Sequence, residues 1–458
     1  MEETRIRELE ELNRYYQKNG SSIVVMYYLH GTDPLPLLND FTEGRGCAYY
    51  LGRPASDRQQ RHLWGIELRA RGLQIGQWPA YTELLETVRR AAGDEPLILM
   101  IEHFEQLLHD GSGFMKALQA MVSDRQQKRR TIVLLMTDEA IWVEQHMIRQ
   151  LGDDAHGISG LLKLREIPFY EMRAAYRQMS FQNVFMTYAV LGGQTQRWNV
   201  LDRKRSFKDN ICQHLLTGGS SLQIQLQEMI RRPLREPAVY NTILCELAAG
   251  SGKLNDLYHA TGFSRAKIAV YLKNLMMLEL VEKVFSFGNT GIENTKKGVY
   301  RISDPLLSFW FRFVYPNESS LKMMPSDRFY DIFISAGLQS YLDRFFAEVC
   351  REWLCRLDRE GKLPIHISEQ GEWAGKTGNI DIVAQSENGD TILGICSWKR
   401  TLTGDDFAWL LGCEQKAGLT GKYLYFFSGT GFDTALTKLA GSENGRIRLV
   451  GMEELQNE

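Results

Sequence analysis

Residues 237–302 carry the sequence pattern that most constrains the fold of this chain. Apolar residues recur at helical spacing in Leu244–Ala249 and again in Leu254–Ala260. After a turn, Ser264 is a suitable N-cap for a third helix. That helix has one apolar face, formed by Ile268, Tyr271, Leu272, Leu275 and Leu278. Leu280–Phe287 and Gly298–Ile302 then alternate like two paired strands, with a turn between them at Gly288 and Asn289. Three helices followed by a hairpin predict a winged helix.

The N-terminal part, residues 1–170, alternates two kinds of pattern. Short apolar runs typical of buried parallel strands occur at Ile23–Met26, Ala48–Leu51, Leu97–Ile101 and Thr131–Met136. Helical patterns lie between them, as in Tyr81–Ala92 and Gly113–Asp124. This alternation predicts an α/β domain built on a doubly wound parallel sheet.

The other segments differ from the first in their patterns. Residues 171–235 are helical and carry no strand signal. Residues 321–458 mix helices with strand patterns at Ile380–Gln385, Thr391–Ser397 and Tyr423–Ser428. A chain of 458 residues has the length of about three domains.

Composition excludes several classes of protein. The net charge of −2 argues against a generally basic nucleic-acid-binding surface, so any DNA contact must come from a local patch. Seven cysteines, an odd number with no C-x-x-C pair, predict reduced thiols and no zinc site. The charged start is unlike a signal peptide, and no apolar run approaches the roughly 18 residues of a membrane span. We therefore expect a cytoplasmic protein without membrane contact.

Several sequence fragments, taken in order, resemble those of one protein family. The fragments are YAVLGG (188–193), REPAVYNTIL (235–244), DPLLSFWFRFVYPN (304–317), GNIDIVAQ (378–385), ILGICSWKR (392–400) and YLYFFSGTGF (423–432). Together they are similar to the archaeal-type ATPases, whose chains combine a P-loop AAA-like module, a winged helix and a C-terminal restriction-endonuclease-like domain.

The resemblance implies a division of the chain into four parts. Residues 1–170 would form a degenerate P-loop ATPase-like parallel-sheet domain, and 171–235 its helical lid. Residues 236–320 would form the winged helix, and 321–458 an α/β restriction-endonuclease-like domain. The family is one of ATP hydrolases, so we ask next whether the residues of that chemistry are present.

The segment that matches the phosphate-binding loop lacks every residue of a P-loop. A working loop, G-x-x-x-x-G-K-[ST], uses backbone N–H groups and a Lys to hold phosphates and a hydroxyl to hold magnesium. Registered on the preceding strand, the two Gly, the Lys and the hydroxyl positions hold Tyr28, Asp33, Pro34 and Leu35.

The substituted residues also oppose phosphate binding. Asp33 places a negative charge where a polyphosphate would lie, and Pro34 removes both a cation and a backbone donor. In a shifted register, His30, Gly31 and Thr32 would supply some donors. These loop residues are therefore vestigial cofactor-binding positions.

The second departure follows the strand pattern Leu97–Ile101. The family has Asp and then Glu at its end, whereas this chain has Glu102 and His103. Glu102 is long enough to hold a magnesium-bound water, but His103 cannot act as the same general base. The alternative is that both are polar residues at a strand end. We regard them as vestigial catalytic residues.

The third departure lies in the C-terminal part. Nucleases of the PD-(D/E)-x-K type need carboxylates for a metal and a Lys near the attacking water. Asp381 matches the first position, but Ile395 and Ser397 hold the Glu and Lys positions. Lys399 shares their face if the strand alternation continues, and it would be a migrated Lys. The alternative is an Asp381 that accepts N–H groups and a solvated Lys399. We expect no metal site here.

The predicted winged helix keeps features of a DNA-binding module. Its third helix begins with Ser264, Arg265 and Lys267, and Lys273 follows. No Asp or Glu occurs between Asp256 and Glu279, and Lys296 and Lys297 precede the second wing strand. Such helices contact phosphates and bases in the major groove. The alternative is a winged helix that only connects two larger domains.

The sequence therefore predicts a pseudo-ATPase that acts as a binding or regulatory module, with double-stranded DNA as a candidate partner. We expect no cofactor and no catalysis. Two alternatives remain open. One is an ATPase with a rearranged site, which would need ATP and magnesium. The other is a subunit that complements an intact ATPase relative or another protein partner.

Overall fold

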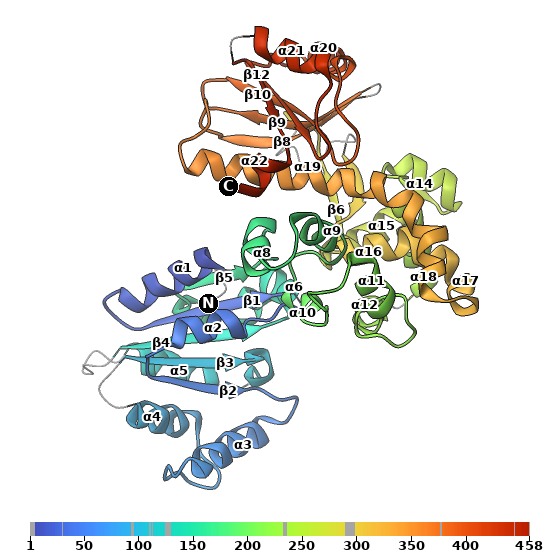
Figure 1. Cartoon of the computed structure of the whole chain (residues 1–458). Helices are drawn as coiled ribbons and strands as arrows, with labels where there is room; N and C mark the ends of the chain where they lie inside the picture. Colours follow the sequence, from blue (N-terminus) through green and yellow to red (C-terminus); the bar gives the residue numbers. More distant parts are fainter. Residues whose placement is uncertain are drawn as a thin grey trace. The chain divides into compact units, whose positions relative to one another are not determined.

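The structure is a computed structural model (Figure 1). It describes residues 5–29, 31–92, 96–109, 111, 113–123, 130–231, 236–288, 298–375, 378–443 and 445–457. The chain forms two compact units. Unit 1 comprises Met1–Ile167 with Gln194–Gln196, and unit 2 comprises Pro168–Gly193 with Arg197–Glu458. The four-part division at 1–170, 171–235, 236–320 and 321–458 stays a prediction.

Unit 1 is built on a five-stranded parallel sheet in the order β2-β3-β4-β1-β5. The strands are β1 (Ser22–Tyr28), β2 (Cys47–Leu51), β3 (Leu97–Glu102), β4 (Thr131–Thr137) and β5 (Gly160–Leu164). The sequence predicted the first four. It missed β5, an edge strand whose Leu161 is 48% exposed and whose run GLLKL is short.

The helices of unit 1 cover both faces of the sheet. They are α1 (Ile6–Gln17), α2 (Leu35–Thr42), α3 (Asp57–Ala70), α4 (Tyr81–Ala91), α5 (Phe114–Ser123), α6 (Ala140–Trp142) and α7 (Ile148–Leu151). Alternate side chains of β1 enter different cores, because successive strand residues point to opposite faces. Ile23 and Val25 pack with residues of α3, α4 and α5, whereas Val24 and Met26 pack with α1 and α2. The predicted doubly wound α/β fold is confirmed.

Unit 2 begins with five helices and continues with three more. The first five are α8 (Phe169–Ala175), α9 (Phe181–Leu191), α10 (Thr195–Trp198, which begins in unit 1), α11 (Phe207–His214) and α12 (Ser221–Arg231). The next three are α13 (Pro237–Ala249), α14 (Leu254–Thr261) and α15 (Arg265–Met277). As predicted, Ser264 caps α15, since its Oγ accepts a hydrogen bond from the backbone N–H of Lys267 at 3.3 Å.

A two-stranded antiparallel hairpin follows α15. Its strands are β6 (Val281–Val284) and β7 (Val299–Ile302), both shorter than the predicted Leu280–Phe287 and Gly298–Ile302. Asn289, Lys296 and Lys297 lie outside the described residues. The three helices and the hairpin occur in the predicted order, and their assignment as a winged helix stays a prediction.

The last part of unit 2 contains a mixed five-stranded sheet in the order β12-β11-β10-β9-β8. Its strands are β8 (Glu369–Ala374), β9 (Asn379–Gln385), β10 (Thr391–Ser397), β11 (Tyr423–Ser428) and β12 (Ile447–Val450). The accompanying helices are α16 (Pro305–Phe309), α17 (Glu318–Met323), α18 (Ser326–Phe329), α19 (Ser335–Arg359), α20 (Gly404–Ala417), α21 (Thr434–Ser442) and α22 (Met452–Asn457). The sequence did not predict β8 and β12, which are the two edge strands.

None of the helices within the described residues combines the length and the apolar character that a membrane crossing needs.

Candidate functional site

The first candidate site lies at the carboxyl ends of β1 and β3 in unit 1. Strand β1 extends to Tyr28, so the residue at the first Gly position of a phosphate loop is still part of the strand. The Tyr28 hydroxyl donates to Oε1 of Glu102 at 3.1 Å, and the Tyr49 hydroxyl donates to Oε2 of the same carboxylate. Both oxygens of Glu102 are therefore engaged by phenols, one from the adjacent β2 and one from β1, which lies on the other side of β4.

The phenols at this edge keep their protons. Burial raises the pKa of the Tyr28 hydroxyl, and the charge of Glu102 raises it further. Burial also raises the pKa of Tyr49, together with its hydrogen bond to Glu102. The two hydroxyls therefore remain hydrogen-bond donors to Glu102 at neutral pH. Tyr49 was missed by the sequence reasoning, and only the pairing of β2 with β3 brings it to Glu102.

The loop after β1 turns tightly into α2. The N–H of Thr32 donates to the carbonyl of Leu29 at 3.0 Å, and Gly31 adopts a φ of +92°, which favours glycine. A carboxylate oxygen of Asp33 accepts the N–H of Leu35 at 3.0 Å. Pro34 is buried and Leu35 is 52% exposed. The carboxylate of Asp33 thus occupies the start of α2, and His30 lies outside the described residues.

His103 adopts a left-handed backbone conformation with a φ of +50°. Its Nδ1 lies 3.4 Å from a carboxylate oxygen of Glu105 and 3.4 Å from one of Asp138. Burial raises the pKa of the Glu105 carboxyl. Glu105 and Asp138 were not among the predicted site residues, because neither occupies a motif position. His103 thus lies beside two acidic side chains.

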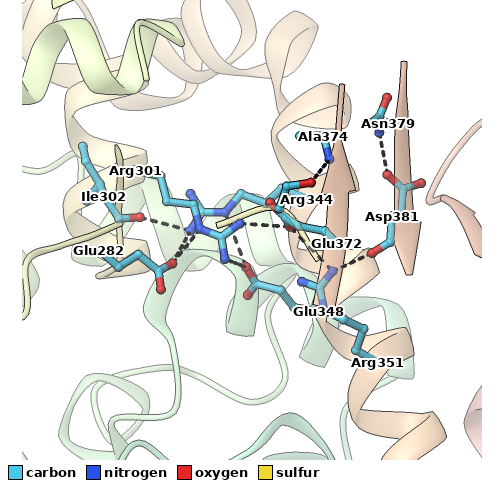
Figure 2. A network of polar contacts seen from close by, with 11 residues as sticks. Glu282, Arg301, Ile302, Arg344, Glu348, Arg351, Glu372, Ala374, Asn379 and Asp381 are labelled. Atoms are coloured by element: carbon cyan, nitrogen blue, oxygen red, sulfur yellow. Dashed lines mark hydrogen bonds and ion pairs between the residues drawn. The ribbon is translucent and has the colours of Figure 1, made fainter. Parts of the chain in front are cut away.

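The second candidate site is a cavity of about 240 Å³ in unit 2. It lies among α19, β7, β8, β9 and β10, and Asp381 lines it (Figure 2). The two Asp381 oxygens accept the N–H of Cys396 at 2.9 Å and the side-chain amide of Asn379 at 2.8 Å. Burial raises the pKa of Asp381, although the N–H of Cys396 opposes this effect. Asp381 therefore accepts two N–H groups, as the alternative interpretation of this residue stated.

The other residues predicted for a nuclease site do not surround this cavity. Strand β10 ends at Ser397, so the alternation assumed for Lys399 does not extend that far, and Lys399 is exposed outside the cavity lining. Ile395 is buried in the apolar core of the sheet. Among the residues that the structure describes, no three His, Cys, Asp or Glu side chains come together to hold a metal ion.

Three arginines line the cavity instead, and they belong to a network of ion pairs. Arg301 of β7 lies 2.6 Å from Glu282, 3.3 Å from Glu372 and 3.8 Å from Glu348. Arg344 and Arg351 of α19 extend this network, Arg344 to Glu348 at 3.4 Å and Arg351 to Glu372 at 3.7 Å. Figure 2 shows how these side chains converge from the hairpin, α19 and the edge of the sheet.

The segment after β6 is also joined to the edge of the mixed sheet. The N–H of Phe287 donates to the carbonyl of Glu372 at 2.7 Å, and the N–H of Ala374 donates to Oγ of Ser286 at 3.0 Å. The Phe287 side chain is buried in the same core as Ile380. The hairpin is thus fixed to the C-terminal sheet by backbone bonds, an apolar anchor and ion pairs.

The third candidate site is the exposed face of α15. Arg265 and Lys267 are exposed, and each lies over an aromatic ring, that of Tyr258 at 4.0 Å and that of Phe263 at 4.9 Å. Small or apolar residues accompany these cations on the exposed side: Ala266, Ala269 and Val270. Lys273 is exposed as well, and the helix contains no acidic residue. Of the predicted DNA-contacting residues, Ser264 caps α15, and Arg265, Lys267 and Lys273 are exposed on this helix.

The chain is similar to several known proteins. Residues 310–407 match the model of a family with the description "Archaea bacterial proteins of unknown function". An uncharacterised protein of Methanocaldococcus jannaschii is 23% identical over 456 residues, which cover 98% of this chain and 99% of that protein.

Solved structures are similar to about two thirds of the chain. A Walker-type ATPase of Pyrococcus abyssi has a TM-score of 0.44 and 13% identity, over 67% of this chain and 95% of its own. The ORC2 protein of Aeropyrum pernix has a TM-score of 0.43 and 15% identity, over 70% and 95%. Unit 1 has the α/β fold with a parallel sheet that the resemblance to archaeal-type P-loop ATPases implied.

Proposed function

We propose that this protein binds double-stranded DNA through α15 and uses neither ATP hydrolysis nor DNA cleavage. The observation that carries the proposal is the exposed side of α15, on which Arg265, Lys267 and Lys273 accompany small apolar residues, in a helix that contains no acidic residue of its own. Cations of this kind pair with phosphates, while Ala and Val side chains suit the methyl group of thymine.

The residues at the sheet edge of unit 1 do not fit a magnesium-bound triphosphate. A phosphate at a helix N-terminus needs free N–H groups, but the carboxylate of Asp33 already accepts the N–H of Leu35. Glu102 accepts two phenolic hydroxyls, which would have to be displaced before the carboxylate could hold a hydrated metal. We therefore propose that no nucleotide binds at this edge. The residues concerned are His103 and the loop residues Gly31, Thr32, Asp33, Pro34 and Leu35.

A second candidate function is a structural connector. The hairpin is fixed to the C-terminal sheet through Phe287 and Arg301, which favours a rigid link between α13–α15 and that sheet. In this case Arg265 and Lys267 would be solvated and would bind no partner. The two functions differ in one measurable property, the affinity for DNA.

Titration of a labelled short DNA duplex with the full chain tests the proposal. We expect binding that weakens as salt rises, with a slope of about −2 to −3 in log affinity against log salt for three phosphate contacts. Addition of Mg²⁺ or Mn²⁺ should leave the duplex intact. Absence of binding at low salt would favour the connector, and metal-dependent cleavage lost in Asp381→Ala would contradict the assignment of Asp381 as vestigial.

A further inference from the structure

A hollow of about 690 Å³ lies between the segments that precede α9 and α11 in unit 2. One side is formed by residues 178–180 and Asn183, and the other by residues 203–206. The two helices pack against each other. We call this hollow the α9–α11 pocket. Its volume is within the range of pockets that bind ligands larger than a single phosphate.

Positive charge is concentrated around the α9–α11 pocket. Arg203, Lys204 and Arg205 are consecutive, exposed and all part of its lining. Arg177 directly precedes the opposite side in the sequence. Burial lowers the pKa of the nearby Arg173, and the positive charge of Arg177 lowers it further. The positive charge of the pocket lining itself comes from Arg203, Lys204 and Arg205, because neither Arg173 nor Arg177 lines the pocket.

Acidic side chains lie beside the α9–α11 pocket rather than in its lining. None of the described residues that line it is Asp or Glu. Asp202 pairs with Arg205 at 3.3 Å from outside the lining, and Asp209 accepts the Ser206 hydroxyl at 2.7 Å. The remaining lining is mostly polar. The Ser180 oxygen accepts the N–H of Asn183, and a hydroxyl that accepts in this way can still donate its hydrogen to a ligand.

We propose that the α9–α11 pocket binds a chain of linked phosphate groups through Arg203 and Lys204. Guanidinium and ammonium groups form strong charge-assisted hydrogen bonds with phosphate oxygens, and the polar side chains of the lining complete the contacts. The linked phosphates belong either to a nucleic-acid backbone or to a free oligophosphate. This site is separate from the face of α15 and does not depend on it.

The experiment uses the full chain carrying Arg265→Glu and Lys267→Glu, so that α15 cannot contribute to binding. Inorganic tripolyphosphate and a short single-stranded oligonucleotide are titrated in separate arms. Adding Arg203→Glu and Lys204→Glu should weaken binding by about tenfold or more. The control is Lys322→Glu with Arg328→Glu, which makes the same charge change at two exposed residues of α17 and α18.

The two arms separate the sources of phosphate. Loss of oligonucleotide binding alone would identify a nucleic-acid backbone, and loss in both arms would identify linked phosphates in general. Because Arg203 also packs over Tyr176 at 4.5 Å, Lys204→Glu alone serves as a second variant that leaves this contact in place. Equal affinities in the pocket and control variants, or no binding to either probe before the pocket is changed, would overturn the proposal.

Discussion

Replacing Arg265 and Lys267 with Glu is expected to abolish binding of the protein to double-stranded DNA. The double substitution removes two cations from the first turn of α15 and adds two charges that repel phosphates. Each lost charged contact typically costs about 1.5 to 3 kcal/mol, so affinity should fall by at least about a hundredfold. Both side chains are exposed, and the Ser264 cap stays in place, so the fold should persist.

Fluorescence anisotropy with a labelled duplex measures this effect, and a thermal melt checks the fold. The matched control is again Lys322→Glu with Arg328→Glu, which changes the net charge by the same amount away from α15. If the control loses as much affinity as the α15 variant, binding depends on net charge alone. Unchanged binding by the α15 variant would place the DNA contact elsewhere.

Arg197→Met is expected to cause the largest loss of stability among single substitutions at ion pairs. Arg197 is almost fully buried, and its Nη2 lies 2.7 Å from Oδ2 of Asp304, which is buried as well. Removing one partner of a buried ion pair leaves an uncompensated charge and typically costs about 3 to 5 kcal/mol. Methionine keeps much of the volume, so the loss reports the ion pair and the hydrogen bond from Arg197 to the carbonyl of Leu191 rather than a cavity. Chemical denaturation monitors the change.

The comparison variants separate the charge from other effects. Lys208→Ala removes an exposed ion pair with Asp331 and should leave the stability nearly unchanged. Adding Asp304→Asn to Arg197→Met should restore part of the stability, because Asn removes the buried charge and its oxygen can still accept the N–H of Leu307. A single variant as stable as the wild type would show that the pair is not important for folding.

The elements predicted correctly from the sequence are those whose signal is local. Strands β1, β3 and β4 are buried on both faces and read as continuous apolar runs. The Ser264 cap depends only on its neighbours. Edge strands such as β5 and β8 have one exposed side and polar or small residues, so their periodicity is weak. They form because a neighbouring strand makes backbone hydrogen bonds with them, and the local sequence does not show this pairing.

The candidate sites were predictable only where a motif marks them. The loss of the phosphate loop could be read at Asp33 and Pro34 without a structure. The carboxylate of Glu102, by contrast, meets Tyr28 and Tyr49 only after three strands are aligned. The Arg301 network joins acids from residue 282 to residue 372, a separation that sequence periodicity cannot connect. Pairings of this kind arise from packing between elements.

We propose that the sheet edge of unit 1 cannot hold a nucleotide. Calorimetric titration of the full chain with ATP and Mg²⁺ tests this proposal directly. We predict no binding at concentrations well above micromolar and no phosphate release, because Asp33 occupies the start of α2 and no Lys is present at the loop position. Micromolar affinity, or ATP turnover that Glu102→Gln abolishes, would contradict the account.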